Sequence, residues 1–147
     1  MAEKVGYYIV DLDVTTGLAG APTLHLQLGV NAVTGIVQGT GEITQALAPP
    51  NGVIHIPQIG GVIHHTGYGK DTLLVSLQGE YLHSNPPSLV VYTVKVTAAL
   101  AVDASWNGTG VFTNGSHVYN DCKVTNVTDQ HASTRSGAAR EHAVTSN

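Results

Sequence analysis

Alternation of apolar and polar residues is the clearest pattern in this chain. From Pro22 to Val30, four aliphatic residues alternate with His25, Gln27 and Gly29, which is the spacing of a β-strand with one buried face. Comparable patterns predict further strands at 5–14, 37–47, 53–59, 62–66, 72–82, 89–102, 110–113 and 116–128. None of these segments shows helical spacing over more than two turns. The sequence therefore predicts an all-β fold, either an antiparallel β-sandwich or a flattened barrel of about eight or nine strands.

Two dipeptides are predicted to form hairpin turns. Thr34-Gly35 as a two-residue turn would place Leu28 opposite Gly41. Gly60-Gly61 would join the strands at 53–59 and 62–66.

Two glycines, Gly39 and Gly41, fall on the buried face of the second hairpin strand and leave space opposite large aliphatic side chains. Protein interiors are close-packed, so something must fill this space. We expect a core aromatic side chain or a β-bulge, with a bound ligand as the alternative.

The segment 72–82 is predicted to be a central strand. It carries one charged residue, Glu80, and the apolar run from Leu73 to Leu77 would pair readily with another strand if it lay at an edge. An edge position would instead predict a dimer joined through this segment. The expected state is a monomer or a weak dimer.

The domain is predicted to span residues 1–128. Residues 129–147 contain one large aliphatic side chain, too few to offset the entropy of ordering them, so they are expected to form a flexible tail.

Charge excludes several classes of partner. Charged residues make up 11% of the chain, there are six Lys and Arg, and the net charge is −4. Nucleic acid is therefore not expected as a partner, because phosphate binding needs clustered cations. No apolar run is long enough to predict membrane insertion. The beginning of the chain does not resemble a signal peptide, which predicts a cytoplasmic protein by default, with unconventional export or surface exposure as the alternative.

Catalytic and metal-binding motifs are not recognisable. Under the predicted Gly60-Gly61 hairpin, His55 and His64 would lie diagonally across two strands and are weak candidates for a metal pair, but a metal site needs more ligands than two. Asp11 and Asp13 share one face of a strand and are expected to lie on an exposed edge. The single cysteine, Cys122, is expected to be a small buried residue. The protein is therefore predicted to need no cofactor and not to be an enzyme.

The segment from 104 to 119 contains the only Trp and the only Phe, among Asn, Gly, Ser and Thr. Trp106, Asn107, Asn114 and Tyr119 are the residue types of a sugar site, where an aromatic face is bordered by amide and hydroxyl groups. The alternative interpretation is that Trp106 and Phe112 close the end of the core.

A family resemblance rests on three segments, 24–31, 37–45 with Pro49-Pro50, and 106–112. Over about residues 3–128 the chain resembles a small family of uncharacterised proteobacterial proteins, known as a domain of unknown function, some of which are studied as antigens. The resemblance implies a β-sandwich and no catalytic residue. We therefore expect a binding or interaction module, with glycans or other small polar ligands as the best candidates. A structural or immunogenic bacterial protein is the first alternative and an enzyme the second.

Overall fold

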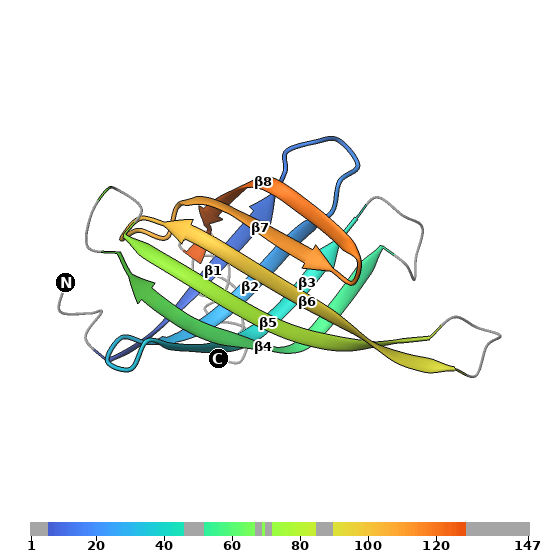
Figure 1. Cartoon of the computed structure of the whole chain (residues 1–147), viewed down its shortest axis with the longest axis horizontal. Coiled ribbons are helices and arrows are strands. Elements are labelled where there is room, and N and C mark those ends of the chain that lie inside the picture. Colours follow the sequence, from blue (N-terminus) through green and yellow to red (C-terminus); the bar gives the residue numbers. More distant parts are fainter. Residues whose placement is uncertain (1–5, 46–51, 67–68, 70–71, 85–89, 129–147) are drawn as a thin grey trace, which may run out of the picture.

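Eight antiparallel strands close into a barrel in the computed structural model of the chain (Figure 1). The structure describes residues 6–45, 52–66, 69, 72–84 and 90–128. The strands are β1 (Tyr7–Thr15), β2 (Thr23–Asn31), β3 (Ile36–Thr44), β4 (Val53–His65), β5 (Leu73–Ser84), β6 (Val91–Val102), β7 (Gly108–Asn114) and β8 (His117–Asn126). Each strand pairs with the next one along the chain, and β8 returns to pair with β1. The predicted all-β fold is confirmed, in its barrel form.

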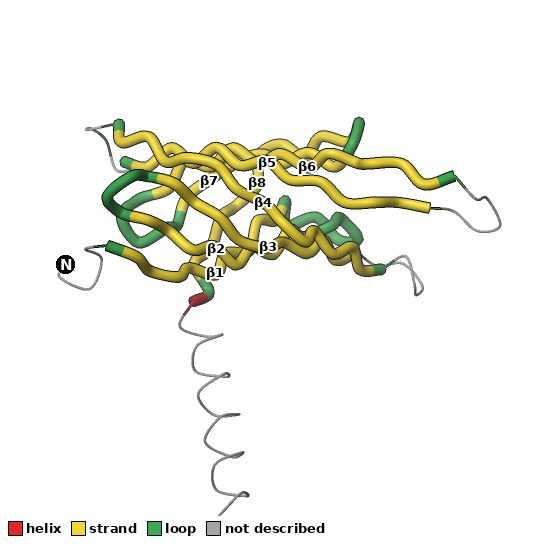
Figure 2. The backbone as a smooth tube through the Cα atoms, turned by 90° about the horizontal axis from the view of Figure 1, so that it is seen from below, coloured by secondary structure: helices red, strands yellow, loops and turns green. Residues whose placement is uncertain are grey.

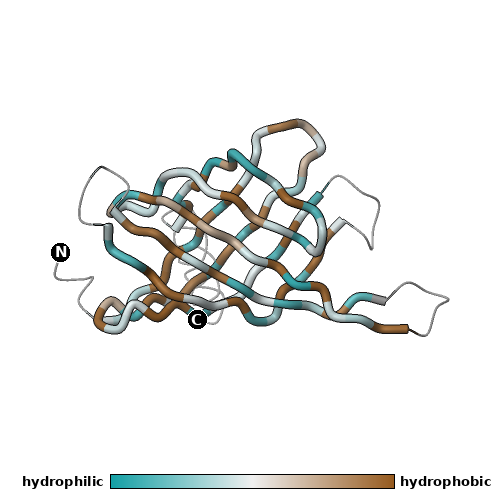
Figure 3. Tube along the Cα trace, in the orientation of Figure 1, coloured by the Kyte–Doolittle hydropathy of each residue, from teal (hydrophilic) through white to brown (hydrophobic). Residues whose placement is uncertain are grey.

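Side chains fill the interior of the barrel. Hydrophobic and hydrophilic residues succeed one another along the strands (Figure 3), and the buried hydrophobic side chains form one core cluster. Its two largest members are Trp106 and Phe112, exposed by 1% and 0%. An eight-stranded barrel has room inside either for its own side chains or for one small ligand. Here the side chains take that room, so a ligand site has to be sought at the ends or on the outer wall.

The β2–β3 turn is longer than predicted, and the predicted pairing is wrong by two residues. Leu28 lies opposite Gly39 rather than Gly41. The side chain of Asn31 accepts hydrogen bonds from the backbone N–H groups of Val33 and Thr34, and Gly35, at φ +77°, donates to the Asn31 carbonyl. Asn31 therefore closes a four-residue turn, because its side chain mimics a backbone turn.

The predicted hairpin at Gly60-Gly61 is also wrong, because both glycines lie inside the continuous strand β4. Their function is close strand packing. A Cβ atom on Gly61 would overlap the carbonyl oxygen of Ser76 on β5, and one on Gly60 would lie 2.9 Å from the carbonyl oxygen of Val37 on β3. Two consecutive glycines are a turn signal in a sequence, but here they allow neighbouring backbones to approach each other.

A β-bulge in β4 fills the space that the glycines of β3 leave. The register between β3 and β4 shifts between Gly39 and Gly41, so that one extra residue of β4 is accommodated and both Ile56 and Ile59 are buried. Ile56 Cδ1 and Leu26 Cδ2 would lie 3.3 and 3.5 Å from a Cβ atom on Gly41. The prediction of a bulge at this position is confirmed.

Strand β5 is a central strand, as predicted, since it pairs with both β4 and β6. The β5–β6 pair extends beyond its neighbours. Pairing with β4 ends at Glu80, and pairing with β7 begins at Val96, whereas β5 and β6 remain paired as far as Ser84 and Val91. Tyr81–Ser84 and Val91–Val94 therefore project from the barrel as a two-stranded ribbon (Figures 1 and 2).

The predicted tail at 129–147 lies outside the described residues. Within the part of the chain that the structure describes, no helix has the length and apolar character needed to cross a membrane.

Candidate functional site

Ring side chains gather at the end of the barrel from which the ribbon projects. By strand parity, Tyr81 and His83 of β5, Tyr92 of β6 and Asn114 of β7 share the side of the sheet that faces the barrel axis. The register shift between β7 and β8 pairs Tyr119 of β8 with the buried Phe112 and brings it to the same side. We call Tyr81, His83, Tyr92, Asn114 and Tyr119 the aromatic shelf. They include three of the six tyrosines in the chain.

Direct contacts hold the shelf together. The Tyr81 hydroxyl donates to Asn114 Oδ1 at 2.7 Å. Tyr119 stacks on the buried ring of Phe112 at a centroid distance of 4.8 Å, and His83 packs against its cross-strand neighbour Tyr92 at 5.2 Å. Because these contacts already order the side chains, little side-chain conformational entropy remains to be lost when a ligand binds.

The shelf residues differ in their exposure to water and in the electrostatic effects on their side chains. Tyr92, on the ribbon, exposes 50% of its surface, whereas Tyr81 and Tyr119 are half-buried. Burial raises the pKa of the Tyr81 phenol; the hydrogen bond to Asn114 opposes this effect, and Tyr92 and Tyr119 add to it. Tyr92 and Tyr119 therefore lie near enough to Tyr81 to influence its ionisation, and Tyr81 stays neutral well above physiological pH.

The opposite end of the barrel is closed by Trp106. The Asp103 carboxylate accepts hydrogen bonds from the N–H groups of Ser105 and Asn107, which folds the β6–β7 loop and holds Trp106 at φ +66°. The indole is thereby directed into the core, where its Nε1–H donates to Tyr8 Oη at 3.1 Å. Trp106 and Phe112 are therefore core residues, as the alternative interpretation of this segment predicted.

The four residues predicted as a sugar site are divided between the two ends. Trp106 and Asn107 precede β7, whereas Asn114 ends it, so extended backbone separates them by roughly 20 Å. Asn107 is also engaged, since its Oδ1 accepts from the backbone N–H of Asn126 at 2.9 Å. Asn114 and Tyr119 come together on the shelf, where Tyr81, His83 and Tyr92 join them. Sequence reasoning missed these three because their pairing depends on the register of the β5–β6 hairpin.

A groove of ≈ 920 Å³ lies on the outer wall of β3–β6. Three glutamines line it, Gln38, Gln58 and Gln78, together with the cross-strand neighbours Glu80 and Lys95. It offers hydrogen bonds but no stacking surface, since its one aromatic lining residue belongs to the shelf and turns inward. Exposed hydrogen bonds mostly exchange with water and contribute little net affinity.

Comparison with known protein families identifies the family of this chain. The family model described as "Domain of unknown function (DUF1842)" matches residues 5–119, which include all five shelf residues. The chain belongs to this family. No curated protein matches the chain.

The two weak metal candidates of this DUF1842 domain are far apart. Because Gly60-Gly61 is not a turn, His55 and His64 lie on one strand, nine residues and therefore roughly 30 Å apart. His55 Nδ1 lies 3.2 Å from Glu42 Oε2 instead. Among the described residues, no group of three or more His, Cys, Asp or Glu could hold a metal ion.

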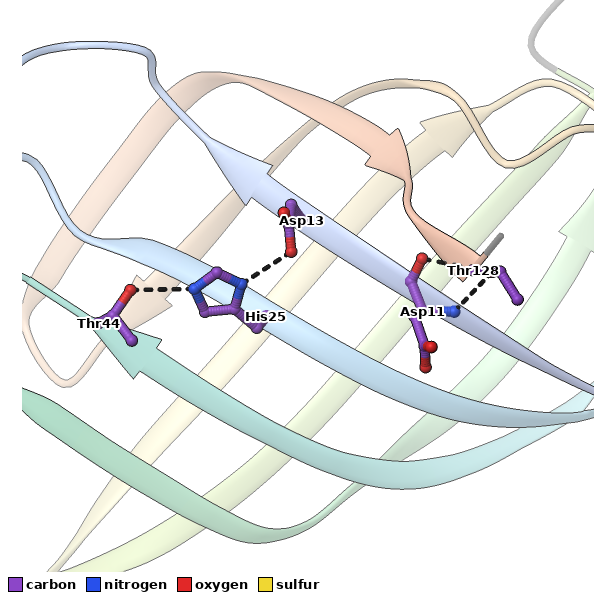
Figure 4. Close-up of polar contacts among 5 residues, drawn as sticks. All are labelled: Asp11, Asp13, His25, Thr44 and Thr128. Carbon is purple, nitrogen blue, oxygen red and sulfur yellow. Dashed lines mark hydrogen bonds and ion pairs between the residues drawn. The ribbon is translucent and has the colours of Figure 1, made fainter. Parts of the chain in front are cut away.

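A hydrogen-bonded array that sequence reasoning did not find crosses the outer wall of β1–β3 (Figure 4). His25 Nδ1 lies 2.7 Å from Asp13 Oδ1, and His25 Nε2 lies 2.9 Å from Thr44 Oγ1. The order of groups is that of an acid–base–hydroxyl triad. However, His25 and Asp13 expose 35% and 31% of their side chains to water. The array therefore clamps three neighbouring strands together.

The predicted exposed edge at Asp11 and Asp13 is wrong. Strand β1 pairs with both β2 and β8, and the backbone after β8 continues along it, where Val127 N–H donates to the Asp11 carbonyl and Asp11 N–H donates to Thr128 Oγ1. Asp11 is therefore only 1% exposed. The sequence left a sandwich and a barrel open, and closure of the barrel turned an apparent edge strand into an interior one.

Cys122 is buried, as predicted. Burial raises the pKa of its thiol, with a smaller opposing effect from a hydrogen bond to the Phe112 backbone and a further increase from Asp121. A thiol in this state is a poor nucleophile.

Proposed function

We propose that this protein is a non-catalytic binding module that holds a neutral saccharide, or a similar small polar ring, against the aromatic shelf. The observation that carries this proposal is the set of contacts in the shelf, where Tyr81 donates to Asn114, His83 packs against Tyr92 and Tyr119 stacks on the buried Phe112. A pyranose has an apolar face that stacks on a ring and a polar rim that pairs with amide and hydroxyl groups.

Stacking is the reason for choosing the shelf over the outer groove. A hydrogen bond exchanged with water contributes about 0.5–1.5 kcal/mol, whereas covering an aromatic face also removes apolar surface from water. Tyr92 presents half of its surface for this purpose. Tyr81 and Asn114 can then contribute hydrogen bonds in a partly dry setting, where such bonds are stronger.

Charge supports a neutral ligand. The shelf contains no Lys, Arg, Asp or Glu, and the charged neighbours on the same strands, Glu80 and Lys95, lie on the outer wall by parity. A sialylated or sulfated glycan would find no cation on the shelf. A neutral hexose or acetamido sugar fits the residue types present.

The non-catalytic part of the proposal rests on the state of the groups that could act. The Asp13–His25–Thr44 array is open to water, and Cys122 is buried with a raised pKa. The shelf itself contains no carboxylate pair of the kind that glycoside hydrolysis requires.

A glycan array tests the proposal, with Tyr92→Ala as the site variant and Tyr7→Ala as its matched control. Tyr7 is 66% exposed on β1 and lies at the other end of the barrel. We expect neutral glycans to bind the native protein and the Tyr7→Ala variant, and to lose at least tenfold in affinity for Tyr92→Ala, with unchanged circular dichroism for both variants. A uniformly negative array, or equal loss in both variants, would refute the proposal.

A further inference from the structure

The aromatic shelf contains two groups of side chains that follow one another along the strands. The inner group lies at the end of the barrel and consists of Tyr81, Asn114 and Tyr119. The outer group lies on the ribbon and consists of His83 and Tyr92, whose ring centroids are 5.2 Å apart. Tyr92 exposes 50% of its surface, whereas the inner tyrosines are half-buried. The shelf therefore offers a ligand two places to bind.

Strand register sets the distance between the two groups. Asn114 pairs with Val96 of β6, and Tyr92 precedes Val96 by four residues on the same strand. Extended backbone rises about 3.3 Å per residue, so Tyr92 and the row of Asn114 lie roughly 13 Å apart along the strand. Stacked rings have their centroids about 4.5–7 Å apart. A single sugar ring that stacks on Tyr92 is therefore too short to reach the amide of Asn114 as well.

The shelf is open at its outer end. Pairing with β4 ends at Glu80 and pairing with β7 begins at Val96, so neither of these strands flanks the outer group. The ribbon carries this group away from the barrel (Figures 1 and 2). Val94, opposite Tyr81, lies between the two groups on the same side of the sheet and adds no charge. A ligand can therefore run from one group to the other and continue past the outer end.

We propose that the ligand is an extended, β-1,4-linked chain of neutral sugars that lies along the shelf, with one unit on the inner group and a later unit on the outer group. Chain binding rests on the sugar binding proposed above, to which it adds the length and the linkage of the ligand. Because one ring cannot reach both groups, only a chain makes use of all five shelf residues.

The linkage follows from the one-sided arrangement of the shelf. All of its rings and its amide lie on the same side of the sheet, so the units of the ligand have to present their faces in one direction. A β-1,4-linked chain of pyranoses is extended and keeps its rings nearly in one plane, which allows units at both groups to stack at the same time. An α-1,4-linked chain curves into a helix and turns successive rings away from the shelf.

Chain length should control the affinity. Once one unit is bound, the linkage holds the following units close to the second group, and the second contact becomes intramolecular. The affinity should therefore rise with chain length until both groups are covered, and then remain constant. A site for a single ring would show only the small gain that the equivalent registers of a repeating chain provide.

Isothermal titration calorimetry of the full chain tests this dependence, with cello-oligosaccharides and chito-oligosaccharides from monosaccharide to hexasaccharide as ligands. We expect the hexasaccharide of the better-binding series to bind at least tenfold more tightly than its monosaccharide. Equal affinity at every length would overturn chain binding while sugar binding on the shelf still stands. The absence of binding at every length in both series would overturn chain binding, and a negative glycan array beside it would refute the sugar site as well.

The outer group is tested by Tyr92→Ala, with Leu82→Ala as the matched control. Leu82 lies on the same ribbon and is 72% exposed, but by parity it points to the opposite face. Tyr92→Ala should abolish the dependence of affinity on chain length, whereas Leu82→Ala should preserve it, with unchanged circular dichroism for both variants. A length dependence that survives in Tyr92→Ala would show that the added units lie elsewhere, and would overturn the proposal.

Discussion

Replacing Trp106 with Ala should destabilise the fold rather than remove a ligand contact. The indole is 1% exposed, donates to Tyr8 Oη at 3.1 Å and meets the Tyr8 ring edge-on at 6.4 Å. Ala at this position has to adopt the same left-handed backbone, with φ near +66°, as Trp does. The change in the free energy of unfolding therefore reports mainly on the loss of the indole side chain.

The magnitude follows from these contacts. Truncating a buried Trp to Ala costs about 3–5 kcal/mol through lost burial and the cavity left behind. Loss of the hydrogen bond adds about 1 kcal/mol at most, because Tyr8 is only partly buried and water can replace the donor. We expect a loss of about 4 kcal/mol from a total stability of about 5–15 kcal/mol.

Urea unfolding monitored by far-ultraviolet circular dichroism measures this loss, since the variant lacks the only Trp and cannot be followed by its fluorescence. With a urea dependence of about 1–3 kcal/mol per molar, the midpoint should fall by about 2 M. Tyr8→Phe, which removes the hydroxyl alone, should cost about 1 kcal/mol. A loss below about 1 kcal/mol for Trp106→Ala would refute the assignment of this residue to the core.

Three further outcomes follow from the structure. Gly61→Ala should severely destabilise the barrel because the new Cβ overlaps the Ser76 carbonyl. Gly41→Ala should change the unfolding free energy by less than about 1 kcal/mol, because its Cβ meets the side-chain tips of Ile56 and Leu26 and lies at ordinary contact distance, 3.6 Å, from the His25 carbonyl oxygen. Thermal unfolding of both variants compares them. The Cys122 thiol should react with a thiol reagent at pH 8 only after denaturant is added, and immediate reaction in the native state would contradict its burial. Because the pKa of Tyr81 is raised above 10.0, its contribution to stability is complete below pH 10 and is lost as the pH rises further, so the unfolding free energy should fall less steeply above pH 10 in Tyr81→Phe.

Strand existence was predictable because each strand carries its own period-two pattern. The alternation at 24–30 and at 90–102 directly reports which side chains enter the core. Segment 72–82 was correctly predicted to be central, because its low charge and high apolar content would be hazardous at an edge.

Register and glycine function were not predictable, because they depend on contacts between strands. The turn after β2 is set by the Asn31 side chain, and a two-residue turn at Thr34-Gly35 satisfied the local pattern equally well. Gly60-Gly61 is indistinguishable from a turn in sequence, and only the neighbouring carbonyl of Ser76 explains why side chains are excluded there.

Part of the candidate site could be predicted from the sequence. Asn114 and Tyr119 were identified by residue type, but Trp106 and Asn107 were grouped with them because they are near in sequence. Strand β7 carries the two pairs to opposite ends of the barrel. Tyr81 and Tyr92 reach the shelf through the register of a hairpin whose turn length the sequence pattern did not define.

The most direct test of the binding proposal is a map of amide chemical-shift changes in a ¹⁵N-labelled protein titrated with a neutral oligosaccharide. The account predicts that the saturable changes cluster at Tyr81, His83, Tyr92, Asn114 and Tyr119. Changes that cluster instead around Trp106, or on the outer-wall groove of Gln38 and Gln78, would contradict it.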